Sequence, residues 1–187
     1  IDRAISVTGA SFDYLRLTQK DGKWSLALEA VKKIIRPNTR ALYINSPNNP
    51  TGWVMTKHQQ KELLEICRAR NITIIADEVY HRMIYDANMA PSFLEVARPT
   101  DSVIVINSFS KTYAMTGWRI GWGVTPGSLE EQMATISECF NTSAPSFIQS
   151  AAITALGKGE ETISSLKKRY HTGREIVMQV LGSHPLI

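Results

Sequence analysis

Residues 39–77 read TRALYINSPNNPTGWVMTKHQQKELLEICRARNITIIAD, with two short apolar runs on either side of a helical pattern. The runs Thr39 to Asn45 and Ile72 to Ala76 are continuous and largely apolar, as strands buried on both faces of a parallel sheet are. Between them, apolar side chains recur at helical spacing, and Thr56 with Gln59 has the pattern of a capping box. This stretch therefore predicts a strand–helix–strand unit with parallel strands.

The rest of the chain supplies the other elements of such a fold. Val103 to Asn107 is a third apolar run, which we expect to add a third parallel strand. Ser128 and Glu131 have the pattern of a second capping box at the start of a helix. We further expect a strand and a turn within residues 5–17, a buried strand over 120–124, and helices over 26–35, 147–156 and 161–181. Together these elements predict an α/β fold with a mostly parallel sheet.

Polar side chains follow the three predicted parallel strands, each within a few residues of the strand's carboxyl end. They are Asn49, Asp77 and Lys111. In open parallel sheets the ligand crevice lies outside the carboxyl ends of the strands. We therefore expect an amide, a carboxylate and an amine to converge at one edge of the sheet.

A cofactor with an aldehyde, a ring nitrogen and a phosphate would use this set of side chains. Lys111 can form a Schiff base with the aldehyde when its amine is deprotonated. Asp77 can hold a pyridine nitrogen in its protonated form, which makes the ring an electron sink. Asn49 and Tyr80 can donate hydrogen bonds to a phenolic oxygen of the same ring.

A phosphate would be held by a second group of side chains close to Lys111. Arg119 follows Lys111 by eight residues and supplies a planar guanidinium that suits bidentate phosphate binding. Ser108 and Ser110 add hydroxyl donors next to the lysine. The residues thus indicate one cofactor site rather than several separate ones.

Four runs at these positions closely resemble the motifs of class I/II aminotransferases of fold type I, which use pyridoxal 5′-phosphate (PLP). The runs are Asn49 to Gly52, Asp77 to Tyr80, Ser110 to Lys111, and Met115 to Arg119. A weaker similarity extends over nearly the whole chain. The resemblance implies the α/β fold of the family's large domain, three layers α/β/α around a mostly parallel sheet. It also implies a transaminase that moves an amino group from an amino acid to a 2-oxo acid.

The resemblance also assigns roles to the matching positions. It implies that Lys111 is the Schiff-base lysine and catalytic proton shuttle, and that Asp77 is the partner of the pyridine nitrogen. The implied cofactor contacts are Asn49 and Tyr80 at the phenolic oxygen, and Ser108, Ser110 and Arg119 at the phosphate.

By the same resemblance, we expect residues 1–187 to be the central and C-terminal part of the PLP-binding large domain. The N-terminal arm and the C-terminal small domain of the family are absent from this stretch. The family arginine that binds the substrate carboxylate belongs to the small domain, so we assign it to no residue here. The resemblance further implies a homodimer in the full-length protein, and activity of residues 1–187 alone is not expected to be complete.

Composition and charge limit the kinds of partner that this chain is expected to bind. Of the 187 residues, 43% are hydrophobic, which is ample for a core. The net charge of +4 is spread along the chain, so we expect no nucleic-acid partner. No stretch approaches the roughly 20 apolar residues that span a bilayer, so we expect no membrane segment. Cys67 and Cys139 lack the spacing of a metal site or disulfide framework, which fits a reducing cytoplasm.

Two other functions share this fold and stay open on the sequence. A PLP-dependent lyase that cleaves carbon–sulfur bonds would use the same lysine and aspartate. An aminotransferase-like effector domain of a transcription regulator would carry an additional DNA-binding segment upstream. Ser108 to Lys111 also match the Ser-x-x-Lys pattern of serine β-lactamases, but the companion Ser-Asp-Asn and Lys-Thr-Gly motifs do not occur.

Overall fold

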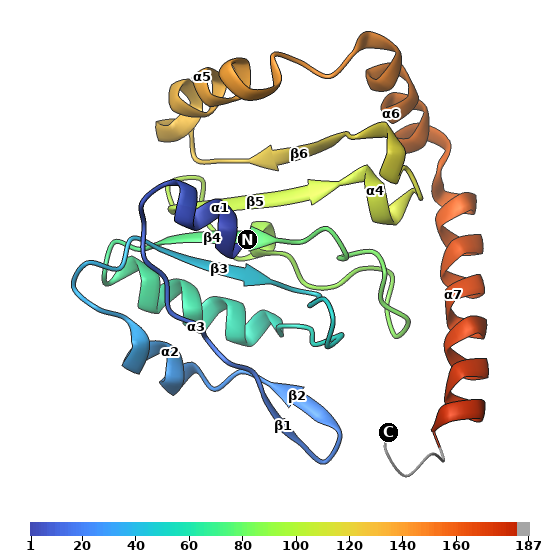
Figure 1. The fold of residues 1–187 in the computed structure, drawn as a ribbon, viewed down its shortest axis with the longest axis horizontal. Coiled ribbons are helices and arrows are strands. Elements are labelled where there is room, and N and C mark those ends of the chain that lie inside the picture. Colours follow the sequence, from blue (N-terminus) through green and yellow to red (C-terminus); the bar gives the residue numbers. More distant parts are fainter. Residues whose placement is uncertain (183–187) are drawn as a thin grey trace.

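The computed structural model describes residues 1–182, and a four-stranded sheet lies at its centre (Figure 1). Strands β3, β4 and β5 are parallel, and β6 runs antiparallel to β5. The three parallel strands and the strand–helix–strand unit predicted from the sequence are therefore confirmed. In their order across the sheet, the strands are β3 (Ala41–Asn45), β4 (Thr73–Asp77), β5 (Val103–Ser108) and β6 (Gly121–Val124).

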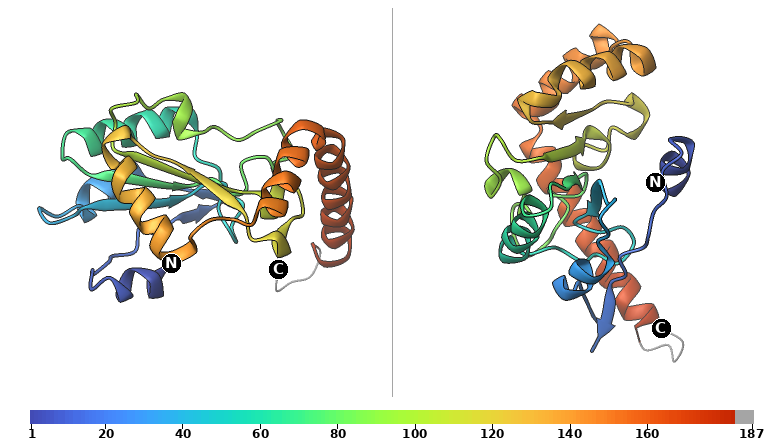
Figure 2. Two further views of the ribbon diagram at one scale, coloured as in Figure 1. Left: turned by 90° about the horizontal axis from the view of Figure 1, so that it is seen from above. Right: turned by 90° about the vertical axis from the view of Figure 1, so that its left-hand side faces the viewer.

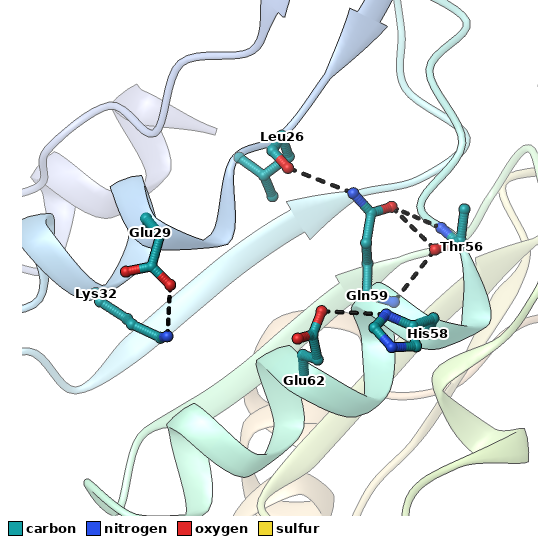
Figure 3. A network of polar contacts seen from close by, with 7 residues as sticks. All are labelled: Leu26, Glu29, Lys32, Thr56, His58, Gln59 and Glu62. Atoms are coloured by element: carbon teal, nitrogen blue, oxygen red, sulfur yellow. Dashed lines mark hydrogen bonds and ion pairs between the residues drawn. The ribbon is translucent and has the colours of Figure 1, made fainter.

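Helix α3 (Lys57–Arg68) connects β3 to β4 and begins with the predicted capping box. The hydroxyl of Thr56 accepts a hydrogen bond from the backbone N–H of Gln59 at 3.2 Å. In return, Oε1 of Gln59 accepts from the backbone N–H of Thr56 at 3.0 Å. The amide of Gln59 also donates to the carbonyl of Leu26 at 3.3 Å, which ties α3 to the segment before α2 (Leu28–Ile34) (Figure 3).

The hydrophobic core lies between α3 and one face of the sheet. Leu63, Leu64 and Cys67 are buried on the inner side of α3. Burying one aliphatic side chain of this size contributes roughly 1.5–3 kcal/mol, so this layer holds α3 against the strands. The strand residues in the same cluster are Ile44, Ile74, Ala76, Val103 and Val105.

The opposite face of the sheet is only partly buried. Residues at alternate positions, among them Tyr43, Ile75 and Ile104, are half-buried, and Ile106 is 39% exposed. Figure 2 shows α1 (Asp2–Val7) on this side and α3 on the other, and α1 buries none of its residues. The expectation of burial on both faces is therefore wrong for the described residues, because one helical layer alone packs closely on the strands.

Two expectations near the N-terminus and at the sheet edge are also wrong. Residues 5–17 contain no strand; β1 (Thr18–Lys20) follows them and forms an antiparallel hairpin with β2 (Lys23–Ser25). Strand β6 is exposed along its length instead of buried, because it lies at the edge of the sheet and has one neighbouring strand. An apolar run alone does not distinguish an edge strand from a central one.

The second predicted capping box does not form. Residues Gly127–Leu129 make a 3-10 turn, so α5 (Glu130–Asn141) begins one residue before Glu131 and has Leu129 at its N-cap. No side-chain hydrogen bond caps this helix. The turn takes up the residues that the capping pattern needed, and it moves Ser128 out of the N-cap position.

Helices α6 (Ser146–Lys158) and α7 (Glu160–Leu181) confirm the two C-terminal helices expected from the sequence. Figure 1 shows α7 beyond the edge to which the arrowheads of the parallel strands point. Among the helices of residues 1–182, none combines the length and the apolar character required to cross a membrane. The carboxyl ends of β3, β4 and β5 therefore face the side of the molecule on which α7 lies.

Candidate active site

The carboxyl ends of the parallel strands bring three of the predicted site residues to one edge of the sheet. Asp77 is the last residue of β4, and it pairs in register with Asn45 of β3 and Ile106 of β5. Asn49 lies in the loop that follows β3, and Lys111 lies in the short helix α4 (Phe109–Thr112) directly after β5. The amide, the carboxylate and the amine therefore share the edge that the strand order predicted.

Asn49, Tyr80 and Lys111 form a connected group. The side-chain amide of Asn49 donates a hydrogen bond to the phenolic oxygen of Tyr80 at 3.2 Å. Nζ of Lys111 lies 5.7 Å from the centre of the Tyr80 ring, within cation–π range. Tyr80 thus links the loop after β3 to the helix after β5.

The loop that carries Asn49 is shaped by side-chain hydrogen bonds to its own backbone. Oδ1 of Asn45 accepts from the backbone N–H of Asn49 at 2.8 Å, and Oδ1 of Asn48 accepts from the hydroxyl of Thr51 at 2.7 Å. Gly52 closes the loop with φ of 72°, a left-handed conformation that favours glycine. Asparagine side chains commonly replace backbone partners in such turns, so the composition of this run explains its conformation.

The carboxylate of Asp77 accepts two hydrogen bonds, and neither of them was predicted from the sequence. The phenol of Tyr43 donates to Oδ2 of Asp77, and the backbone N–H of Val79 donates to Oδ1 at 3.3 Å. Burial, and then the hydrogen bond to Asp77, raise the pKa of the Tyr43 phenol above its ordinary value. The signal in the sequence is spacing: Tyr43 precedes Asn45 by two residues, so both point to the same face of β3.

The hydroxyl groups of Ser108 and Ser110, close to Lys111, differ in their hydrogen bonding. Oγ of Ser108 accepts from the backbone N–H of Ser110 at 3.1 Å and donates to the carbonyl of Ile120 at 3.2 Å, so it caps α4. The hydroxyl of Ser110 has no hydrogen-bond partner within residues 1–182. Ser110 is therefore free to donate to a ligand as it stands, whereas the Ser108 hydroxyl would first have to release the Ile120 carbonyl.

Arg119 lies at the exposed end of a turn between α4 and β6. Its φ of 52° is left-handed, and its Nη1 donates to the carbonyl of Thr116 at 2.9 Å. The hydroxyl of Thr116 in turn donates to the carbonyl of Ser110 at 3.2 Å. The structure therefore connects Arg119 to Ser110 through Thr116, with most guanidinium N–H groups directed to no protein acceptor in the described chain.

A second polar group behind the site was missed by sequence reasoning. Asn107, the residue before Ser108, accepts from the backbone N–H of Ser108 at 2.8 Å, which fixes the orientation of its amide. Nδ1 of His81 lies 2.8 Å from that amide nitrogen and 3.2 Å from the backbone carbonyl oxygen of Glu78. Burial lowers the pKa of the His81 imidazole.

An open hollow of about 520 Å³ lies beside Asn49 and Tyr80. Its wall also includes Tyr85, Asp86 and, from α7, Arg174. The space is large enough for a small organic ligand, and it has both aromatic and polar walls. Within residues 1–182, no cluster of three or more His, Cys, Asp or Glu side chains is arranged to hold a metal ion.

The model of one protein family, aminotransferase class I and II, matches residues 1–183 of this chain. The arginine–pyruvate transaminase of Pseudomonas aeruginosa is 35% identical over 158 residues, covering 84% of this chain and 40% of the relative. The aromatic-amino-acid aminotransferase 2 of Thermococcus litoralis is 34% identical over 168 residues, covering 88% and 43%. The chain thus spans less than half the length of these curated relatives.

Solved structures with the same fold include two aminotransferases. The N-succinyldiaminopimelate aminotransferase of Mycobacterium tuberculosis has a TM-score of 0.86 at 29% identity, over 95% of this chain and 46% of that one. A PLP-dependent aminotransferase of Streptococcus suis has a TM-score of 0.84 at 31% identity, over 97% and 47%. The α/β fold with a mostly parallel sheet, predicted from the sequence, is therefore shared with these enzymes.

Proposed function

Because the chain belongs to the class I and II aminotransferase family, we propose that the full-length protein is a PLP-dependent transaminase. It would move an amino group from an amino acid to a 2-oxo acid. The observation that carries the proposal is the contact between Asn49 and Tyr80 with Lys111 beside the Tyr80 ring, at the same sheet edge as Asp77. An isolated lysine or aspartate would not support it, because either is common at strand ends.

The side chains at this edge fit PLP by their chemistry. Lys111 would bond the aldehyde carbon, and Asp77 would face the ring nitrogen. Asn49 and Tyr80 would hold the phenolic oxygen, and their own hydrogen bond places both donors together. For the phosphate, Ser110 and Arg119 offer free donors, and Ser108 would join them when its hydroxyl turns away from Ile120.

When bound, PLP supplies an aldehyde that takes up the amino group and a ring that withdraws electrons from the substrate's α-carbon. The protein's part is to position groups and to move protons. Nζ of Lys111, as a free amine, would take the proton from the substrate's α-carbon and deliver it to the aldehyde carbon of the cofactor. Asp77 would keep the ring nitrogen protonated, because a neighbouring carboxylate stabilises the positive charge of the protonated nitrogen.

Several features of the full-length protein belong to the same proposal. Residues 1–187 would form the central and C-terminal part of the PLP-binding large domain, and the enzyme would be a homodimer without nucleic-acid or membrane partners. A cytoplasmic location fits the free thiols of Cys67 and Cys139. The donor is open: the relatives named above include enzymes for arginine and for aromatic amino acids, and each name describes that protein only.

The decisive experiment is chemical trapping on the full-length protein. PLP is added, borohydride reduces any carbon–nitrogen double bond, and mass spectrometry of peptides identifies the modified lysine. We expect labelling at Lys111 and none in a Lys111→Ala variant, with Lys61→Ala, an exposed lysine of α3, as the matched control. Folded protein that is labelled elsewhere, or nowhere, would contradict the proposal.

The transaminase is then distinguished from the lyase by its products. Arginine, aromatic amino acids, aspartate and a sulfur-containing amino acid are each offered with pyruvate, with 2-oxoglutarate and without any 2-oxo acid. A transaminase consumes both partners and forms a new amino acid, whereas a lyase releases a 2-oxo acid from a sulfur-containing amino acid without any acceptor. Acceptor-independent turnover would replace the transaminase assignment by the lyase.

A further inference from the structure

Tyr43 is the side-chain partner that the structure provides for the Asp77 carboxylate. Its phenol donates to Oδ2, while the backbone of Val79 donates to Oδ1 at a longer 3.3 Å. Among residues 1–182, no lysine, arginine or histidine forms an ion pair with Asp77. Tyr43 is thus the main proton donor that restrains one oxygen of this carboxylate.

The sheet register fixes this contact. Asn45 and Asp77 are paired residues of the parallel strands β3 and β4, and Tyr43 lies one pleat back from Asn45 on the same face. The amide of Asn45 donates to the main-chain carbonyl of Asp77 at 3.2 Å, so the end of β4 is held beside β3. A phenol reaching forward from position 43 therefore meets the carboxylate, and an aliphatic side chain at that position could not make the contact.

The Tyr43 phenol stays protonated and therefore keeps donating its hydrogen bond to Asp77. Burial and the neighbouring carboxylate both raise its pKa, so it stays protonated through the neutral range. A hydrogen bond from a neutral donor stabilises the ionised form of a carboxylate. Each carboxylate oxygen accepts more than one hydrogen bond, so Asp77 keeps lone pairs for a ligand while Tyr43 restrains its plane.

We propose that Tyr43 is a positioning residue for the cofactor: its hydrogen bond holds the Asp77 carboxylate oriented toward the ring nitrogen. This inference rests on the proposed function, because it takes Asp77 as the partner of that nitrogen. Tyr43 itself touches no reacting atom and acts only through Asp77. A purely structural tyrosine in the same place would affect folding but would leave recognition of the ring nitrogen unchanged.

The test compares the binding of two ligands to the full-length protein. One is PLP, and the other is its deaza analogue, in which a carbon replaces the ring nitrogen. The ratio of their dissociation constants reports on the contact between Asp77 and the nitrogen, independently of catalysis. Wild type should prefer PLP, Asp77→Asn should abolish the preference, and Tyr43→Phe should reduce it about tenfold, the scale of one lost hydrogen bond to a charged group.

Tyr14→Phe is the matched control, because Tyr14 also donates to a carboxylate, that of Asp2, and that pair is exposed near the N-terminus. It should leave the ratio unchanged. A Tyr43→Phe protein with the full wild-type preference, while Asp77→Asn abolishes it, would overturn the inference and leave the proposed function intact. A wild-type protein that does not bind PLP would overturn both.

A second measurement covers the case in which Tyr43→Phe does not fold. Tyrosines labelled with carbon-13 at Cζ are titrated by NMR in the wild-type and Asp77→Asn proteins, with Tyr43 assigned by its environment. The Tyr43 phenol should ionise at a higher pH beside the carboxylate than beside the amide. Equal titration in the two proteins would show that no such hydrogen bond exists and would overturn the inference.

Discussion

Lys111 carries the largest share of the proposed chemistry at the scale of single residues. Replacing it with alanine removes the amine that would bond the cofactor and move the proton. We expect the Lys111→Ala protein to lose transamination by at least about a thousandfold, the scale of losing both a nucleophile and a base. PLP should still bind noncovalently, as measured by its absorbance after equilibrium dialysis, and undiminished turnover would refute the role of Lys111.

The residues that the sequence predicted and those it missed differ in how their positions are determined. Asn49, Asp77 and Lys111 follow strand ends, and the alignment of parallel strands brings such residues to one edge whatever the loops do. The contact between Tyr43 and Asp77 depends on a side chain that reaches from β3 to the adjacent β4. It can be predicted only when the register of these two strands is known. The contact between the Asn107 amide and His81 joins β5 to the segment after β4, and only the three-dimensional structure defines it.

At the scale of elements, local signals succeed where neighbouring residues do not compete with them. Thr56 and Gln59 form their predicted capping box because Thr56 is extended and residues 52–55, before it, form no turn that would take up the N-cap position. Ser128 and Glu131 have the same spacing, but the 3-10 turn of Gly127–Leu129 uses those residues first. Edge position in a sheet is likewise a property of the whole fold, so the exposure of β6 could not be predicted from its own residues.

Strand β6 approaches β5 closely at one glycine, and this contact supports the segment that carries Lys111. A Cβ on Gly121 would lie 2.6 Å from the backbone oxygen of Asn107, whereas one on Gly123 would lie 3.7 Å from that of Val105. We expect Gly121→Ala to lower the free energy of unfolding by about 1–3 kcal/mol, as overpacking does, and to weaken PLP binding. Urea unfolding measures the first effect.

Gly123→Ala is the matched control for that prediction, because it adds the same methyl group to the same strand at an ordinary contact distance. It should change the free energy of unfolding by less than about 1 kcal/mol. Equal effects of the two substitutions would show that the close approach of β6 to β5 is not what limits position 121.

An ion pair between Arg68 and Asp101 connects the last turn of α3 to the loop before β5. Arg68 donates from Nε to Oδ1 of Asp101 at 2.7 Å and from Nη2 to Oδ2 at 2.5 Å, and the Asp101 side chain is 7% exposed. We expect Asp101→Asn to lower the free energy of unfolding by about 2 kcal/mol, the scale of a hydrogen bond between charged groups. Glu65→Gln removes the exposed partner of Arg68 and should cost less than about 1 kcal/mol.

The contribution of this pair should also depend on pH in one direction. The hydrogen bond from Arg68 lowers the pKa of Asp101 below its ordinary value of 3.8. The stabilisation is therefore fully present above that value and is lost as the pH falls through the lower pKa of the folded protein. Urea unfolding at pH 7 and at about pH 3 should show the difference between wild type and Asp101→Asn shrinking at the acid end, and a constant difference would contradict this account.

At the scale of the whole molecule, the C-terminal helices leave large apolar side chains in contact with solvent. Phe140 at the end of α5 is 82% exposed, and Phe147, Ile153 and Leu156 of α6 are 67%, 71% and 63% exposed. Several large apolar side chains exposed on two consecutive helices usually mark a surface that another chain or domain covers. The proposed homodimer would account for such a surface, because a two-fold interface buries the same patch on both subunits.

The homodimer makes a prediction for the full-length protein that sedimentation can measure. It should sediment as a dimer, and Ile153→Glu should shift it toward monomer if α6 lies in the interface, because two like charges would then be buried near the two-fold axis. Leu94→Glu is the matched control, since Leu94 is 50% exposed on a different part of the surface. A monomeric wild-type protein would contradict the homodimer, and a dimeric Ile153→Glu protein would place the interface elsewhere than on α6.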